Sequence, residues 1–274
     1  VAEEIRAVAE RVGVLDLTGF AKYDVTGRDA EAFLNRICAN RMPIRQGGIA
    51  LVHPLSRGGR IQGEMTVTRF ADDHFYCLSA AAAEQRDLDL MVQSRLPGED
   101  VAIANVTEDR GVLVLSGPRS KLTDADLSNA RFRWLSGQEI DVAGHRVRAL
   151  RVSYVGELGW ELHPEIDAMV PLYEAIWAAG QDLRIANYGL YAVNTMRTEK
   201  GYKAWGSELT NELTMIEADM RRFINFKKDE FVGKQATLDA PDRPMRIIYG
   251  EMDADTVDPR GGEPILVGDR CIGM

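Results

Sequence analysis

The order of strand-like and helix-like segments is the feature that most constrains the fold of this 274-residue chain. Stretches of alternating apolar side chains predict strands, and apolar residues three or four positions apart predict helices. The two kinds of segment are mixed without the regular strand–helix–strand alternation of a doubly wound parallel sheet. Neither of the two common Gly-rich phosphate loops occurs in the sequence. The pattern therefore favours an α+β fold and argues against a dinucleotide-binding fold.

The elements can be placed by their periodicity and by the residues that interrupt it. Helices are predicted over 1–11, 29–38, 81–96, 166–179 and 189–200. Strands are predicted over 20–25, 49–54, 60–70, 74–79, 101–106, 112–115, 139–142, 145–152 and 160–163. From 241 onward prolines, paired glycines and short strand-like runs replace this mixture. We expect that last region to be a separate, incomplete β domain.

Charge and composition exclude several classes of protein. The chain carries 42 acidic and 33 basic side chains, a net charge of -9, and nucleic-acid binding depends on concentrated positive charge. No apolar run approaches the length of a membrane span, and the first residues predict a charged amphipathic helix rather than a signal peptide. We expect a protein of the cytoplasm or of an organelle matrix, with neither a nucleic acid nor a membrane as its partner.

Cysteine and histidine usage argues against a metal site. The three cysteines lie far apart with no CxxC spacing, and the four histidines show no HxxxH-type spacing. We therefore expect reduced thiols and no metal.

Glu64 is the first candidate for a functional side chain. Alternation along the predicted strand 60–70 puts it on the polar face with Gln62 and Thr66. Spacing alone favours the simpler interpretation, an ordinary glutamate that faces solvent.

The segment 151–162 places two carboxylates, Glu157 and Glu161, four residues apart among glycines and aromatic residues. Glycines in a turn let a flat ring approach the backbone closely. Glu161 has apolar neighbours, so its carboxylate needs hydrogen-bond donors, and the edge of a pterin-type ring with two adjacent N–H groups would supply them. The alternative is a β-turn with one exposed glutamate and one salt bridge. The residues alone leave the two interpretations about equal.

A third candidate region is the end of the predicted helix 189–200. Helical spacing puts Asn194, Arg197 and Gly201 along one side, so the arginine could reach a cavity that the helix end borders. Tyr202 and Trp205 could either stack on a ligand ring or belong to the core, and the core is favoured for each of them taken singly.

These segments together resemble the aminomethyltransferase superfamily, which includes the T-protein of the glycine cleavage system. The matching segments are 14–23, 27–34, the Gly-Gly hairpin before Glu64, 154–161, 197–209 and 231–234. Within the superfamily the chain is most similar to the C-terminal half of dimethylglycine and sarcosine dehydrogenases. The residues that carry this likeness are 38–43, 199–202 and the Trp205-Gly206 pair.

The resemblance implies a three-lobed ring around a central folate site. Its lobes would be two α+β domains, over 1–110 and 111–240, and a small β-barrel, truncated here, over 241–274. Family barrels continue further, so we expect the chain to be part of a larger flavoprotein.

The same resemblance assigns roles to single residues. The family's catalytic acid, an aspartate in T-proteins, falls at Glu64. Its pterin-recognising glutamate falls at Glu161, with Glu157 as second choice. Arg197 corresponds to the helix arginine that assists folate binding, and Tyr154 and Trp205 would line the pocket.

The implied function is tetrahydrofolate-dependent one-carbon transfer. A separate FAD domain or subunit would oxidise an N-methyl amine of the dimethylglycine or sarcosine type, and tetrahydrofolate would capture the carbon as 5,10-methylenetetrahydrofolate. One alternative is a stand-alone aminomethyl- or methyltransferase. Others are a non-catalytic folate-binding protein and an iron–sulfur assembly factor. The iron–sulfur branch has Lys-Gly-Cys near the helix end, whereas Tyr202 follows Lys200-Gly201 here.

Overall fold

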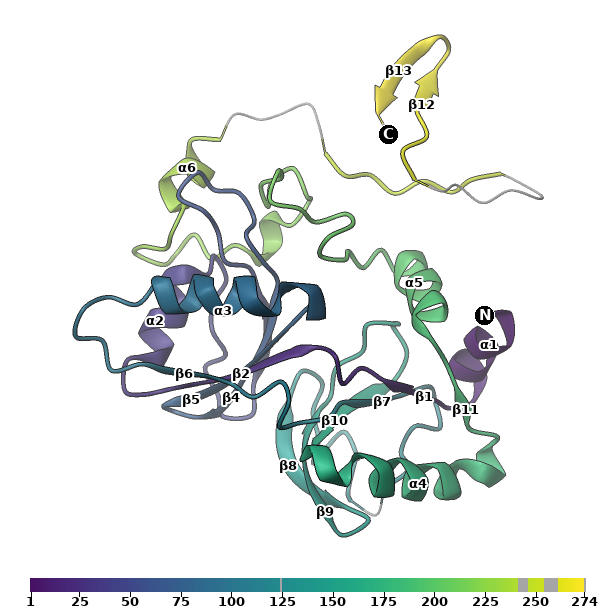
Figure 1. Ribbon diagram of the computed structural model, residues 1–274. Helices are drawn as coiled ribbons and strands as arrows, with labels where there is room; N and C mark the ends of the chain where they lie inside the picture. The colour runs from purple at the N-terminus through teal and green to yellow at the C-terminus, as the bar shows by residue number, and fades with distance from the viewer. Residues whose placement is uncertain (124, 241–245, 254–260, 274) are drawn as a thin grey trace.

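Two large sheets organise the computed structural model, which describes residues 1–123, 125–240, 246–253 and 261–273. The first sheet is antiparallel with the strand order β3-β4-β5-β2-β6 (Figure 1). Its strands are β2 (Ala21–Thr26), β3 (Ile49–Val52), β4 (Met65–Ala71), β5 (His74–Ser79) and β6 (Ala102–Asn105). Helices α2 (Ala30–Ile37) and α3 (Glu84–Gln93) lie over this sheet. Phe33, Leu34 and Ile37 of α2 are buried in the core of this unit.

The second sheet has the order β11-β1-β7-β10-β9-β8, and only its β1–β11 pair is parallel. Its strands are β1 (Gly13–Asp16), β7 (Leu113–Ser116), β8 (Gly137–Val142), β9 (His145–Leu150), β10 (Gly159–Pro164) and β11 (Ala186–Asn187). Helix α4 (Met169–Gly180) covers one face, where Trp160 and Leu162 are buried. The opposite face contributes Leu15 and Val114 to a cluster with α1 (Ala2–Glu10) and α5 (Leu190–Glu199).

The rest of the chain contains little regular structure. Residues from Leu209 to Phe231 pack their apolar side chains against the loops around Leu55 and Ile61 of the first unit. Short elements follow, α6 (Lys234–Leu238) and an exposed hairpin of β12 (Ile265–Val267) and β13 (Arg270–Gly273). Three-residue 3-10 turns occur at Ala81–Ala83, Ile166–Ala168, Gln181–Leu183 and Arg221–Phe223.

One arginine joins the two sheets. Arg148 on β9 donates two hydrogen bonds, of 2.8 and 3.2 Å, to the carboxylate of Asp24 on β2. Its guanidinium also lies over the rings of Phe70 and Tyr76, 5.3 and 4.7 Å from their centres. Burial raises the pKa of Asp24, but hydrogen bonds and charge from His74 and Arg148 outweigh it and hold that pKa below its ordinary value. The pair is therefore charged. It joins the two sheets together with backbone hydrogen bonds, such as the 2.7 Å bond from Gly137 N–H to the carbonyl oxygen of Gly47.

The predicted α+β class is confirmed, with two corrections to the elements. The strand β1 was missed, and it lies between β7 and β11 in the second sheet although it comes early in the chain. The predicted strand 60–70 begins only at Met65, because Leu55 and Arg60 form isolated bridges to Ile61 and Thr214 instead.

The sequence also predicted a truncated β-barrel at the C-terminal end and a ring of three lobes. The strands of the described ranges form no closed barrel. The predicted barrel region 241–274 includes 241–245, 254–260 and 274, which lie outside the described residues. The domain boundaries at 110 and 240 and the ring arrangement stay predictions. No helix of the described residues is long and apolar enough to cross a membrane.

Removing the Arg148 side chain should loosen the contact between the sheets. We expect Arg148→Ala to lower the free energy of unfolding by about 3 kcal/mol, because it leaves a partly buried carboxylate without its main partner. Urea denaturation measures this. The matched control is Arg146→Ala on the same strand, whose side chain is 76% exposed and pairs with the exposed Glu139. The control should cost no more than about 0.5 kcal/mol, and equal losses in the two variants would contradict the assignment.

Candidate functional site

Glu64 immediately precedes β4 and meets a histidine that immediately follows β3. Val52 pairs with Met65 in the antiparallel register, so the next residues along each strand, His53 and Glu64, lie opposite one another. His53 Nε2 is 2.9 Å from Glu64 Oε2, and the histidine ring is completely buried while the Glu64 side chain is 17% exposed. One oxygen of the Glu64 carboxylate thus contacts the buried histidine, and the side chain remains partly exposed to solvent.

Asn40 orients this histidine. Its Oδ1 accepts a hydrogen bond of 2.7 Å from the backbone N–H of His53, and its Nδ2 lies 3.3 Å from His53 Nδ1. Behind Asn40, the ammonium group of Lys228 donates to the carbonyl oxygens of Cys38 and Asn40, at 2.6 and 2.8 Å. Burial lowers the pKa of Lys228 to about 8. A buried polar chain therefore runs from Lys228 through the Asn40 segment to Glu64.

Glu161 is held in a similar way on the second sheet. Alternation along β10 puts Glu161 and His163 on the face opposite Trp160 and Leu162. His163 Nε2 is 3.2 Å from Glu161 Oε2, and His163 Nδ1 is 3.1 Å from the hydroxyl of Tyr76 on the first sheet. The histidine ring is again completely buried, and the Glu161 side chain is 17% exposed.

The glycine-rich turn before β10 presents Tyr154 beside the end of α5. Its ring stacks on Tyr202 with 6.3 Å between ring centres, and its hydroxyl donates a 2.8 Å hydrogen bond to the carbonyl oxygen of Lys203. Gly156 has a φ of +76°, and a Cβ there would lie 2.6 Å from the Lys200 side chain. Glu157 faces the same lysine at 3.7 Å. The two carboxylates of this region therefore differ in their partners. Glu157 pairs with a partly exposed lysine, whereas Glu161 contacts a buried histidine.

Arg197 is buried, and all of its N–H groups have acceptors within the chain. Its Nε and one terminal nitrogen donate to Asn194 Oδ1, at 2.9 and 2.6 Å. The two terminal nitrogens reach Glu208 at 3.0 and 3.3 Å, and one of them also reaches the carbonyl oxygen of Tyr202 at 2.8 Å. The arginine therefore ties the end of α5 to the segment that follows it.

Trp205 approaches the site from this segment. The guanidinium of Arg86, at the start of α3, lies over the Trp205 ring, 4.6 Å from its centre, and donates to Asp87 Oδ1. A Cβ on Gly63 would lie 3.3 Å from the same Asp87 oxygen. Trp205 is thus linked through Arg86 and Asp87 to the residue next to Glu64.

Electrostatics show which of the predicted residues lie within range of one another. Burial raises the pKa of Tyr154, the positive charge of Arg197 opposes this, and the carboxylates of Glu64 and Glu208 raise it further. The structure therefore brings Glu64, Tyr154 and Arg197 together, with Trp205 linked to them through Arg86. Glu161 lies where β10 faces the first sheet, next to Tyr76.

Sequence reasoning missed four buried partners of the two glutamates. They are Asn40, His53, Tyr76 and His163. Two signals were available: His163 follows Glu161 by two residues on one strand face, and a β3–β4 hairpin places His53 opposite Glu64. The spacing of the histidines was tested only against metal-ligand patterns, which do not describe a histidine that donates to a carboxylate.

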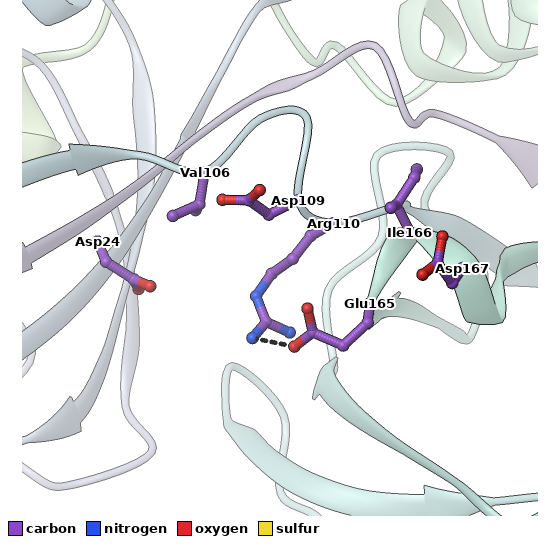
Figure 2. A pocket seen from close by; sticks show the side chains of 7 residues that line it. All are labelled: Asp24, Val106, Asp109, Arg110, Glu165, Ile166 and Asp167. Carbon is purple, nitrogen blue, oxygen red and sulfur yellow. Dashed lines mark ion pairs between the residues drawn. The ribbon is translucent and has the colours of Figure 1, made fainter.

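A separate hollow of about 320 Å³ is lined in part by Asp24 of the first sheet and by Arg110 and Glu165. Figure 2 shows its lining, in which Arg110 and Glu165 form an ion pair at 2.6 Å. Asp24 is already bonded to Arg148 and His74. None of the predicted site residues lines this hollow. Arg110 and Glu165 are paired with each other, and Asp24 is bonded to residues outside the lining, so we assign the hollow no function.

Comparison with known proteins connects this arrangement to one family. The family model described as the GCVT N-terminal domain matches residues 1–228. Mitochondrial dimethylglycine dehydrogenase of Rattus norvegicus is 36% identical over 282 residues, covering 100% of this chain and 33% of that protein. An aminomethyltransferase of Thermoanaerobacter sp. (strain X514) is 30% identical over 280 residues, covering 100% of this chain and 76% of that protein.

Solved structures agree on the fold. Aminomethyltransferase T of the glycine cleavage system from Bartonella henselae superposes with a TM-score of 0.77 at 24% identity, covering 86% of this chain and 64% of that one. At that identity the likeness concerns the fold alone. The chain spans about a third of the length of the curated dimethylglycine dehydrogenases that it matches.

The half-buried ammonium group of Lys228 should make the stability of the protein depend on pH. Its folded-state pKa is about 8, whereas that of an unfolded lysine is about 10.4, so between these values the unfolded state binds more protons. Stability relative to a Lys228→Met variant should therefore rise as the pH increases from about 8 to about 10. Urea denaturation of both proteins across this window measures the difference. An exposed-site control, Lys227→Met, should show no such trend, and a flat difference for Lys228→Met would contradict the prediction.

Proposed function

Because this chain belongs to the GCVT aminomethyltransferase domain family, we propose that it performs tetrahydrofolate-dependent one-carbon transfer. The unit transferred is the methylene group of an oxidised N-methyl amine of the dimethylglycine or sarcosine type. The observation that carries the proposal is a pair of carboxylates, Glu64 and Glu161, each held through one oxygen by a buried histidine. Relatives in this folate-related family include dimethylglycine dehydrogenases and a sarcosine oxidase subunit.

The residues present fit a reduced folate. Among the described residues, Oε1 of Glu64 and Oε1 of Glu161 accept no hydrogen bond, so each can receive an N–H donor. Tyr154 and Tyr202 are each 39% exposed, and their stacked rings offer a flat apolar surface. An exposed carboxylate oxygen beside an aromatic face matches a heterocycle that carries N–H groups on its edge.

Each predicted residue then has a distinct task. Glu161 would accept hydrogen bonds from the pterin edge, with Glu157 as the second choice. Tyr154 and Trp205 would contact the rings. Arg197 would act by fixing the segment that carries Trp205, since its own donors are all engaged.

Glu64 supplies negative charge to the reacting centre. When bound, tetrahydrofolate would supply the amine nitrogens that take up the carbon as 5,10-methylenetetrahydrofolate. A carboxylate fixed beside developing positive charge stabilises it without having to reorganise, and it can hold a proton released from an amine. His53 keeps Oε2 occupied, so Oε1 is the atom available for this task.

Oxidation of the amine requires a partner. The homologous dimethylglycine dehydrogenases are about three times as long as this chain, which covers 32–33% of their lengths. We place an FAD-containing domain or subunit in the remainder of the assembly, with the two α+β domains 1–110 and 111–240 forming the folate unit. The mitochondrial relatives favour the matrix as the location in a eukaryote, and the cytoplasm applies in a bacterium.

A second candidate is a stand-alone aminomethyltransferase that needs no flavin partner. It is favoured by the Thermoanaerobacter relative, of which this chain covers 76%. If the chain transfers a one-carbon unit to tetrahydrofolate in the absence of any flavoprotein, this candidate is favoured over the first.

Glu161→Gln tests the binding assignment. The substitution keeps the size of the side chain and removes its charge, so the dissociation constant for tetrahydrofolate should rise about tenfold or more. Calorimetric titration of the full chain measures it. Glu165→Gln, on the Arg110 ion pair outside the site, is the matched control and should bind like wild type. If Glu157→Gln weakens tetrahydrofolate binding and Glu161→Gln does not, the pterin contact is assigned to Glu157 instead.

Glu64→Gln tests the chemical role. Tetrahydrofolate affinity should stay within about threefold of wild type, whereas methylene capture in the flavin-containing holoenzyme should slow by about a hundredfold. The measurement is the ratio of 5,10-methylenetetrahydrofolate formed to free formaldehyde released at equal amine oxidation. An unchanged ratio would remove Glu64 from the reaction.

A further inference from the structure

Both site carboxylates are held by the same kind of buried contact. His53 and His163 come from different sheets, yet each points Nε2 at Oε2 of a glutamate and receives a polar neighbour at Nδ1. Each ring is completely buried. A buried imidazole with two polar neighbours must match its single proton to them, so the neighbours at Nδ1 determine its tautomer.

At His53 the neighbour is an amide whose orientation is fixed. Asn40 Oδ1 accepts from the backbone N–H of His53 at 2.7 Å, and Asn40 Nδ2 donates to the carbonyl oxygen of Leu51 at 3.1 Å. The atom that faces His53 Nδ1 at 3.3 Å is therefore the amide nitrogen, which can only donate. Nδ1 accepts, and the ring proton must be on Nε2, facing Glu64.

At His163 the neighbour is a phenol that stays protonated. Burial strongly raises the pKa of Tyr76, so its hydroxyl keeps the proton that it can donate to His163 Nδ1. Burial also lowers the pKa of His163. The hydrogen bond and charge of Glu161 oppose this, while the positive charges of Lys22 and Arg148 reinforce it. The ring is neutral, and its proton is on Nε2, facing Glu161.

We propose that His53 and His163 are positioning residues, each locked in the Nε2–H tautomer so that it donates to a site carboxylate. The donated hydrogen bond holds one carboxylate oxygen, Oε2, and so fixes the rotamer of the glutamate. Its other oxygen, Oε1, is then aimed at whatever the site binds. The link to folate rests on the proposed function, but the tautomers do not.

Nitrogen-15 NMR of the full chain, labelled at histidine and without ligand, tests the tautomers directly. The chain has four histidines, and His53→Gln and His163→Gln assign two of the ring signals. We expect neutral Nε2–H rings for both at pH 7.5. His145 is not fully buried and serves as the internal reference for a ring free to exchange tautomers. An Nδ1–H or doubly protonated ring at either site would overturn the proposal for that site.

Asn40→Asp replaces the group that donates to His53 Nδ1 by one that accepts, and so tests whether Asn40 sets the tautomer of His53. A carboxylate at position 40 accepts where the amide donated, so the ring between it and Glu64 should become doubly protonated. Asn187→Asp, at an exposed position hydrogen-bonded to Tyr173, is the matched control and should leave the His53 signals unchanged. A neutral Nε2–H ring that persists in Asn40→Asp would show that Asn40 does not set the tautomer.

The effect on binding separates this proposal from the proposed function. His163→Gln keeps a donor near Glu161 and should bind tetrahydrofolate within about threefold of wild type, whereas His163→Leu should bind about tenfold more weakly. If Glu161→Gln weakens binding and a folded His163→Leu does not, positioning by His163 is wrong and the folate function stands. If neither weakens binding, the folate function fails while the tautomer result stands on its own. If His163→Leu does not fold, the ring signals of the labelled wild type still decide, and an Nδ1–H ring at His163 would still overturn the proposal for that site.

Discussion

The contact of Arg148 with Asp24 is a largely buried ion pair between the two sheets, and it lies beside the Tyr76–His163 contact that positions Glu161. A guanidinium and a carboxylate removed from water are tolerated only when their hydrogen bonds are well aligned, and this pair has two, with Phe70 and Tyr76 against the cation. Tyr76 then reaches His163 on the opposite sheet at 3.1 Å. The arrangement of Glu161 is thus a consequence of how the sheets are joined.

Burial explains why both site glutamates have a histidine partner. A carboxylate in a mostly apolar setting loses hydration, and a neutral imidazole returns one hydrogen bond without adding a second charge. A lysine or arginine in that place would neutralise the charge that the proposed reaction uses. Lys228 donates to the backbone carbonyls of Cys38 and Asn40 and so supports the Asn40 segment.

Arg197 illustrates how a side chain can serve a site without contacting a ligand. Its contacts with Asn194, Glu208 and the Tyr202 carbonyl leave no donor for another molecule in this arrangement. They do hold the segment that presents Tyr202 against Tyr154. The family likeness and the helical spacing both indicated this arginine. In the structure its hydrogen bonds hold the end of α5 and the segment after it together.

The sequence by itself determined the α+β class, most helices and strands, and the family, because periodicity and motif order are local properties of the chain. It also indicated Glu64, Tyr154 and Glu161 as candidates, although their roles stay predictions. The place of strand β1, the late start of β4 and the contacts between the two sheets were decided by the tertiary structure. Tyr76 and His163 are 87 positions apart, and Asp24 and Arg148 are 124 apart. Such pairs form only when two sheets pack, and no local pattern encodes which strands will be neighbours.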